Sequence, residues 1–492
     1  MIGQVVHLSS WYLLGLVVSL LAFDRLPAVF LCCSAFFWGV LFWSAAWLVA
    51  LHIPFGATRL TAAIIILLVL LLLSLRRIRR GVSRPRFQDV VVGASVLGLV
   101  ACVAWFSAVL RLAAGSFDSV ALIRLGESIL ERGFSPWALY RLGHRGVMAA
   151  MLHGTVAYTG GGCLYGLQPV MAVSFVLTFC WLSFRVLLHV CGGRSVALVL
   201  SLAGCAVLFS SRLMMLQCFF VHDNLIAAAF FFIGAACIWL SFSEDNNGWL
   251  APASWAMVAF SLTRLEGPLY ALIPLTVGCS ELGYNKRLKL ALPAVIAGVV
   301  WNAGQLVGRQ SESWALLSEN WLAALLVVLC GFGLLQLFSF VDTVERAVIR
   351  HLRELLLLSL AGFLLLAFMM KPAAMTRSVL VIGRNIFPPL SIWQSWWGLT
   401  WVFIAAAYVL SLGLGRFRQE WVMSTVIVSF LLLTLLVSYG RNPYRFGWGD
   451  SGNRMMTHIA PIAVLYVFAR YAGAVAEIMG SRRPAATSGS TR

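Results

Sequence analysis

Charged side chains are scarce in this chain, so those that stand between apolar runs are the first candidates for chemistry. Residues 117–133 read FDSVALIRLGESILERG and contain three acids, Asp118, Glu127 and Glu131. A carboxylate can accept the proton of an attacking hydroxyl, which makes Asp118 a candidate general base. An Asp at a helix start also accepts hydrogen bonds from exposed backbone amides, so N-capping is the alternative role for Asp118.

Four other polar groups interrupt apolar runs: HDN at 222–224, TRLEGP at 263–268, GRN at 383–385 and WGDSGNRMMTHIAP at 448–461. Arginine suits phosphate because its planar guanidinium offers a fork of donors. The arginines of these groups therefore predict one shared phosphate site: Arg264, Arg384 and Arg454. Further candidates for the same site are Glu127, His222, Asp223, Glu266 and His458. The structural alternative is an Arg264–Glu266 ion pair, with Arg454 reaching to the membrane interface.

A metal site is weakly indicated. His222 and Asp223 are adjacent potential ligands, but the cysteines form no CxxC pair and show no Cys/His spacing that suits zinc. We therefore expect no cofactor and no required metal, although His222 and Asp223 leave a divalent ion open. Most of the eleven cysteines lie in apolar runs and are expected to act as small buried hydrophobic residues.

Composition predicts a polytopic membrane protein, because 61% of the residues are hydrophobic and 11% are charged. The fold class is accordingly all-α, with about 15 transmembrane helices. A formal charge of +18 could suggest nucleic acid as a partner. The arginines instead cluster in short segments between apolar runs, as the positive-inside rule describes, and no nucleic-acid partner is expected.

Charge distribution also predicts orientation. Residues 76–86 read RRIRRGVSRPR, with six arginines and no acid, and are expected on the cytoplasmic side. The basic, polar tail at 481–492 is expected to be disordered and cytoplasmic as well. The span after the first basic segment then runs outward, which places residues 117–133 on the outer face of the membrane.

Spans can be counted from the basic segment at 76–86 or from the C-terminal tail. The two counts place each loop on the same side of the membrane only if residues 146–166 do not cross it. This segment is rich in glycine and contains His153, so we expect an interfacial or partly re-entrant helix. The first outer connection then runs from about 111 to 168, long enough to indicate function. The predicted organisation is N-terminal helices with a basic loop (1–87), a catalytic membrane domain (88–480) and the tail (481–492).

The order of these motifs resembles that of GT-C-type membrane glycosyltransferases, the superfamily of the protein O-mannosyltransferases and aminoarabinose transferases. The resemblance extends over about 89–479 and depends on FDS at 117–119, HDN at 222–224, TRLEGP at 263–268 and NRMMTHIAP at 453–461. It implies a GT-C fold, with Asp118 as the catalytic base. It also implies a polyprenyl-phosphate sugar donor and an acceptor that is a glycan, a lipid or a protein.

The resemblance places such an enzyme in the cytoplasmic (inner) membrane of a bacterium, among membrane lipids, with its active site facing the periplasm or the exterior. Two alternatives remain. A lipid-linked oligosaccharide polymerase or ligase would typically place its large outer loop late in the chain, whereas here the long connection is early. A non-enzymatic lipid or sugar transporter would distribute charges along a path across the bilayer rather than on one face.

Overall fold

A computed structural model of the chain describes residues 2–23, 26–53, 58–79, 86–142, 146–159, 165–309, 316–387, 396–440 and 451–478. Within these ranges the regular elements are all helical, which confirms the predicted all-α class. The tail at 481–492 and residues 80–85 of the basic segment lie outside the described residues.

The helices are, in chain order, α1 (Ile2–Ala22), α2 (Ala28–Ala50), α3 (Thr58–Arg79), α4 (Phe87–Leu110), α5 (Phe117–Arg132), α6 (Pro136–Leu142), α7 (Val147–Thr159), α8 (Leu167–Cys191), α9 (Arg194–Phe209), α10 (Arg212–Gln217), α11 (Asn224–Ser243), η1 (Asn247–Trp249), α12 (Leu250–Thr263), α13 (Gly267–Cys279), α14 (Tyr284–Arg309), α15 (Leu316–Phe338), α16 (Asp342–Ala347), η2 (Ile349–His351), α17 (Leu352–Met370), α18 (Pro372–Ile386), α19 (Thr400–Ser411), α20 (Glu420–Gly440) and α21 (Ser451–Ile478).

Nine helical segments in the described part of the chain are long and apolar enough to cross a membrane. They belong to α1, α2, α3, α4, α8, α11, α17 with the turn before it, α20 and α21. Shorter apolar helices accompany them, including α7, α9, α13 and α19. The protein is therefore a polytopic membrane protein, while the count of about 15 spans stays a prediction.

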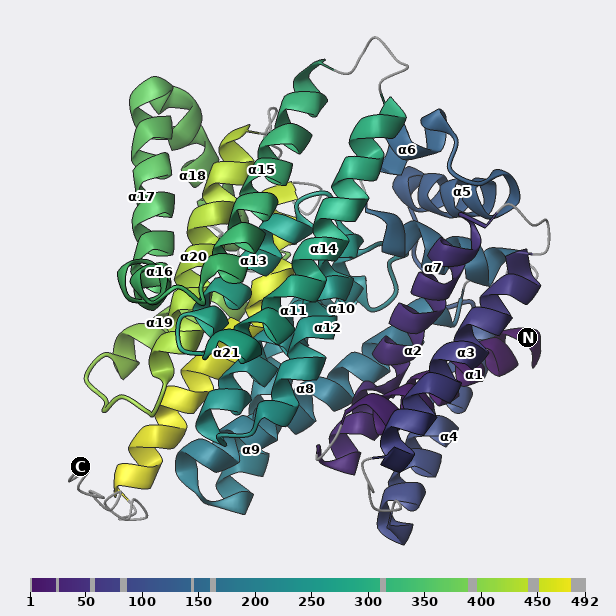
Figure 1. Cartoon of the computed structure of the whole chain (residues 1–492). Coiled ribbons are helices and arrows are strands. Elements are labelled where there is room, and N and C mark those ends of the chain that lie inside the picture. The colour runs from purple at the N-terminus through teal and green to yellow at the C-terminus, as the bar shows by residue number, and fades with distance from the viewer. Residues whose placement is uncertain are drawn as a thin grey trace.

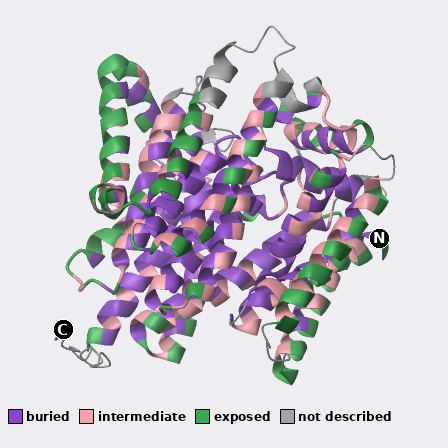
Figure 2. Ribbon diagram, viewed as in Figure 1, coloured by how far each residue is buried: buried purple, intermediate pink, exposed green. Residues whose placement is uncertain are grey.

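Burial separates central helices from peripheral ones. In α11, 94% of the most apolar window is buried, whereas in α3 the corresponding share is 6%. Figure 2 shows the same division, with a buried interior and exposed helices such as α17 at the edge. Because α11 is surrounded by α8, α12 and α21, the polar residues just before it are carried into the middle of the bundle.

The two ends of the molecule carry different features (Figure 1). The last turn of α3 lies at the same end as the last turn of α21, and α5 and α6 lie at the opposite end. Arg76, Arg77 and Arg79 occupy the last turn of α3. This arrangement is the one expected if the basic segment and the C-terminus share one side of a membrane; which side faces the cytoplasm stays a prediction.

The segment expected to be interfacial or re-entrant forms α7, which is shorter than a span. Its 13 residues extend about 20 Å, less than the ~30 Å of a hydrocarbon core. It is not exposed at an interface, because all residues from Val147 to Ala157 are buried. The physical reason is that α5, α2 and α12 pack around it. Residues 160–164 of the predicted segment lie outside the described ones.

Gly126 of α5 and Gly154 of α7 allow these two helices to cross in backbone contact. A Cβ atom added to Gly154 would lie 2.4 Å from the carbonyl carbon of Gly126, and one added to Gly126 would lie 2.0 Å from the carbonyl oxygen of Ala150. Both distances are far below van der Waals contact with backbone atoms that cannot rotate away. The position of α5 therefore depends on both residues being glycine, which has no Cβ atom.

We expect Gly154→Ala to separate α5 from α7 and to reduce the free energy of unfolding by about 1–3 kcal/mol, the usual cost of overpacking. The melting temperature of the detergent-solubilised protein measures the effect. Gly98→Ala on α4 is the matched control, since no heavy atom lies within 4 Å of its added Cβ. Equal melting temperatures for the two variants would contradict the close crossing.

Candidate functional site

The segment before α11 and the segment before α5 are held side by side. The amide of Ala114 donates to the carbonyl of Phe219 at 2.8 Å, and the amide of Val221 donates to the carbonyl of Ala114 at 2.9 Å. These two hydrogen bonds hold the backbone on either side of Phe220, directly before His222, against the segment that leads to Asp118. Asp118 is four residues from Ala114, at most about 14 Å of extended chain.

Arg264 and Glu266 lie in the sharp turn between α12 and α13. Arg264 has an extended backbone, with φ −146° and ψ 160°, which ends α12. Gly146, just before α7, packs against this turn: its φ is +71°, and an added Cβ would lie 2.3 Å from the carbonyl carbon and oxygen of Thr263. Only glycine fits there without displacing the turn.

The guanidinium of Arg264 is buried, with 6% of the residue exposed, and polar groups from two elements surround it. Its Nη1 donates to Oδ1 of Asn224 at 2.8 Å and lies 3.6 Å from Oδ1 of Asp223. Its Nε lies 3.7 Å from Oε2 of Glu266. The Arg264–Glu266 ion pair, the structural alternative from the sequence, is therefore present and belongs to a larger group.

Asp223 is a buried carboxylate. Burial alone would raise the pKa of Asp223, but Arg264 and His222 favour the charged form more strongly, so that its pKa lies well below the ordinary value. The carboxylate is consequently ionised at neutral pH. It provides a fixed negative charge between Arg264 and the imidazole of His222.

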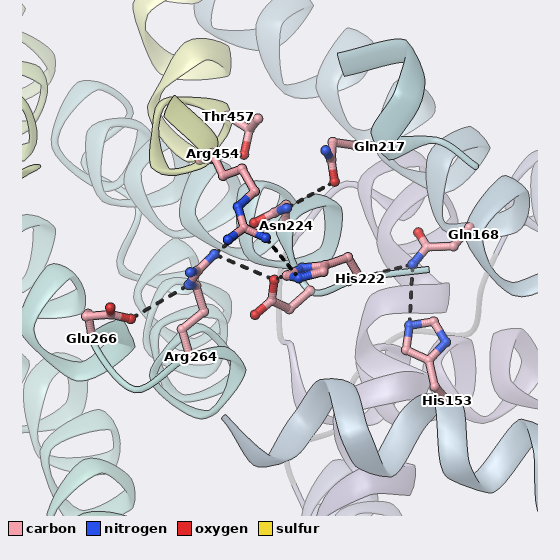
Figure 3. Close-up of polar contacts among 10 residues, drawn as sticks. His153, Gln168, Gln217, His222, Asn224, Arg264, Glu266, Arg454 and Thr457 are labelled. Atoms are coloured by element: carbon pink, nitrogen blue, oxygen red, sulfur yellow. Dashed lines mark hydrogen bonds and ion pairs between the residues drawn. The ribbon is translucent and has the colours of Figure 1, made fainter. Parts of the chain in front are cut away.

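His222 lies between Asp223 and Arg454 of α21 and contacts both (Figure 3). Its Nδ1 contacts the carboxylate of Asp223, and its Nε2 lies 3.3 Å from Nη1 of Arg454. A guanidinium has no acceptor, so a hydrogen bond here requires Nε2 to accept and leaves the imidazole proton on Nδ1. The ring of Phe220 stacks on His222, with centroids 5.9 Å apart and planes inclined by 18°.

Buried amide side chains support this group from neighbouring helices (Figure 3). Nε2 of Gln168, at the start of α8, donates to the carbonyl of His222 at 3.0 Å and lies 3.4 Å from Nε2 of His153. Nδ2 of Asn224 donates to Oε1 of Gln217 at 3.1 Å. These contacts hold the backbone and side chains of residues 222–224 in one orientation.

Helix α21 contributes four polar residues. Arg454 is half-buried, and its carbonyl accepts from Oγ1 of Thr457 at 2.6 Å. Asn453 accepts from the indole of Trp397. His458, one turn after Arg454, is fully buried at the edge of Phe260, with ring centroids 5.8 Å apart. Within the described ranges, neither ring nitrogen of His458 has a hydrogen-bond partner.

The structure thus joins His222, Asp223, Arg264, Glu266 and Arg454, residues that the sequence placed in three separate motifs. We call these five residues the charged cluster. Their meeting depends on α11, the α12–α13 turn and α21 being neighbours in the bundle, which the motifs alone do not determine.

Asp118 lies in the first turn of α5 and is half-buried. The capping interpretation of Asp118 is wrong, because Ser116 occupies the N-cap position and its amide donates to Oγ of Ser119 at 3.0 Å. A carboxylate at Asp118 instead faces the positive end of the helix dipole. Glu127 is half-buried further along α5, beside the crossing with α7.

Of the three arginines predicted to bind phosphate, Arg384 lies outside the charged cluster. It is exposed on α18, while its neighbour Asn385 is buried. Sequence reasoning missed Gln168, Gln217 and Asn453 as supports of the site. The available signal was an amide side chain at the end of an apolar run, where an unpaired polar group would be costly.

No group of three or more His, Cys, Asp and Glu side chains suited to a metal occurs among the residues that the structure describes. In the charged cluster, His222 and Asp223 contact each other and Arg454 or Arg264. A reaction without a required metal stays a prediction.

The fold and the charged cluster define a polytopic membrane protein with a buried, mixed-charge site inside its helix bundle. No family model, no curated protein and no solved structure matches the chain.

We expect Arg264→Gln to destabilise the protein by about 3–5 kcal/mol, because Asp223 and Glu266 would remain buried without their cation. The melting temperature in detergent measures the loss. Adding Asp223→Asn to Arg264→Gln removes one uncompensated charge and should recover part of it. An Arg264→Gln protein as stable as the parent would show that the ion pairs are not required for folding.

Proposed function

We propose that the protein is a membrane glycosyltransferase that moves a sugar from a polyprenyl-phosphate donor to an acceptor hydroxyl at the outer face of the cytoplasmic membrane. One observation supports this most: two arginines from separate helices meet at a His–Asp pair, beside the segment that leads to Asp118. Such a site combines cations for a leaving phosphate with groups able to accept a proton.

Arg454 is the better candidate to bind the donor phosphate. Arg264 is buried against two carboxylates, Asp223 and Glu266, which already balance its charge. Arg454 is half-buried and faces an imidazole nitrogen of His222 at 3.3 Å, whereas Arg264 is buried. Its greater exposure makes Arg454 easier for an incoming phosphate to reach than Arg264, whose role is to position Asp223 and Asn224.

In the proposed reaction the acceptor oxygen attacks the anomeric carbon of the sugar. The bond from that carbon to the phosphate oxygen breaks, and polyprenyl phosphate leaves with the bonding electrons. The acceptor proton passes to a base, for which we propose Asp118, the residue that the resemblance assigns. Asp118 is half-buried in the first turn of α5, four residues after Ala114, whose backbone pairs with the segment directly before His222.

His222 is the second candidate for the proton acceptor. Asp223 contacts its Nδ1 and leaves Nε2 as the accepting atom, the orientation that carboxylate-supported histidine bases use. In the structure Arg454 faces that atom. His222 could therefore accept a proton only after Arg454 turns toward another anion, such as the donor phosphate.

Transfer of a labelled sugar from polyprenyl phosphate by the reconstituted protein tests the activity. We expect Arg454→Gln to raise the KM for the donor by about tenfold or more, since a charge-assisted contact contributes roughly 1.5–3 kcal/mol. Arg350→Gln, an exposed position in η2 outside the cluster, is the control. Absence of any transfer across sugar donors, or donor translocation without a glycosylated product, would contradict the proposal.

For the base, we expect Asp118→Asn to fold normally and to reduce the transfer rate on the order of a hundredfold or more. Ser119→Ala removes the hydroxyl that caps α5 and should cost about 0.5–2 kcal/mol of stability while retaining transfer. His222→Gln is measured beside them. Normal transfer by a well-folded Asp118→Asn protein would exclude Asp118, and a large loss in His222→Gln would then assign the role to His222.

A further inference from the structure

A groove with a volume of about 410 Å³ lies between the neighbouring helices α8 and α9. Its lining is mostly apolar and comes from one face of each helix, including Leu177, Trp181 and Phe184 of α8 and Arg194, Leu198 and Leu202 of α9. These positions recur every three, four or eight residues, as positions on one face of a helix do. From Arg194 to Leu202 the groove follows α9 for about 12 Å.

The groove is open toward the membrane. Helix α8 is one of the candidate spans, and α9 is one of the shorter apolar helices beside it. Leu198 and Leu202, which line the groove from α9, are 51% and 53% exposed. Exposed leucines on membrane helices are expected to contact lipid chains. A length of about 12 Å also matches most of one leaflet, which is half of a hydrocarbon core of ~30 Å.

Aromatic packing fixes one wall of the groove. The ring of Trp181 lies 5.5 Å from that of Phe30 in α2 and 6.1 Å from that of Trp249 in η1, measured between centroids. Trp181 is thus held from behind by rings of two other elements while it lines the groove. A wall that is already ordered reduces the entropy cost of binding an apolar chain.

Arg194 is the only charged residue among the described residues that line the groove. Its side chain is exposed, and within the described part of the chain it takes part in no hydrogen bond or ion pair. Arg185 of α8 differs, because its Nε lies 2.6 Å from Oε1 of Glu244. An anion from outside the protein can therefore pair with Arg194 without breaking a contact inside it.

The position of Arg194 suits the headgroup region of a bilayer. It is the first residue of α9, directly after the turn that ends the α8 span. Figure 1 shows α9 toward the end of the bundle where α21 finishes, the end that also carries the arginines of α3. Basic pockets between membrane helices bind anionic lipid headgroups, and a guanidinium pairs with phosphate in two parallel hydrogen bonds.

We propose that the α8–α9 groove binds an anionic phospholipid of the bilayer, with its phosphate on Arg194 and one acyl chain along Trp181 and Leu198. The occupant is a bilayer phospholipid rather than the sugar donor, because Arg194 is far from the charged cluster. Gln168, which contacts the carbonyl of His222, precedes Cys191 by 23 residues, or about 35 Å along α8. This proposal does not depend on the proposed enzymatic activity.

Binding is tested with the full-length protein in neutral detergent, titrated with phosphatidylglycerol or phosphatidylcholine of identical acyl chains and followed by native mass spectrometry. We expect tighter binding of phosphatidylglycerol. Arg194→Gln should weaken that binding by about tenfold or more and leave phosphatidylcholine binding unchanged. Arg76→Gln is the matched control, because Arg76 is an exposed arginine in the last turn of α3, outside the groove.

A second variant tests the groove without changing its charge. Leu198→Trp places a larger side chain in the groove and should weaken phosphatidylglycerol binding, whereas Leu67→Trp on α3, a residue that is 65% exposed outside the groove, should not. Both arginine variants should melt at the parent's temperature, since the altered side chains are exposed.

Three results would overturn the proposal. The first is equal affinity of the parent protein for the two phospholipids. The second is phosphatidylglycerol binding that Arg194→Gln leaves intact or that Arg76→Gln weakens as much, which would indicate attraction to net charge alone. The third is polyprenyl phosphate bound through Arg194 that phosphatidylglycerol fails to displace.

Discussion

The cost of burying a charge among apolar helices is the constraint on which the site depends. Arg264 is almost fully buried, and such a cation is stable only with anions and acceptors at contact distance. Asp223, Asn224 and Glu266 provide them. The start of α11 and the α12–α13 turn must therefore stay together, because separating them would take the buried carboxylate of Asp223 away from Arg264.

The rest of the bundle explains how that arrangement is held. Helix α11 is enclosed on all sides, so its first residue cannot shift without disturbing the core. Gly146 lets α7 approach the turn that carries Arg264, and Gly126 with Gly154 lets α5 approach α7. Close backbone packing thus connects Asp118 to the charged cluster through two helix contacts, in addition to the hydrogen bonds of Ala114. Small residues play the same part here as in other membrane helix contacts.

Sequence reasoning found the charged residues because charge is conspicuous in an apolar chain. It identified His222, Asp223, Arg264, Glu266 and Arg454, and the structure joins them. It could not decide which face of α18 carries Arg384, since that depends on how the helix is rotated against α20 and α21. It also left N-capping open as the alternative role for Asp118, whereas Ser116 occupies that position, because a helix start two residues earlier leaves the hydrophobic pattern unchanged.

The charges of the cluster nearly cancel: Arg264 and Arg454 carry two positive charges, and Asp223 and Glu266 carry two negative ones. Arg264 is buried and contacts two carboxylates, whereas Arg454 is half-buried and faces Nε2 of His222. If Arg454 binds the donor phosphate, as we propose, its guanidinium turns away from Nε2 of His222. In that proposal, anion binding and the release of a proton acceptor are coupled through one side chain.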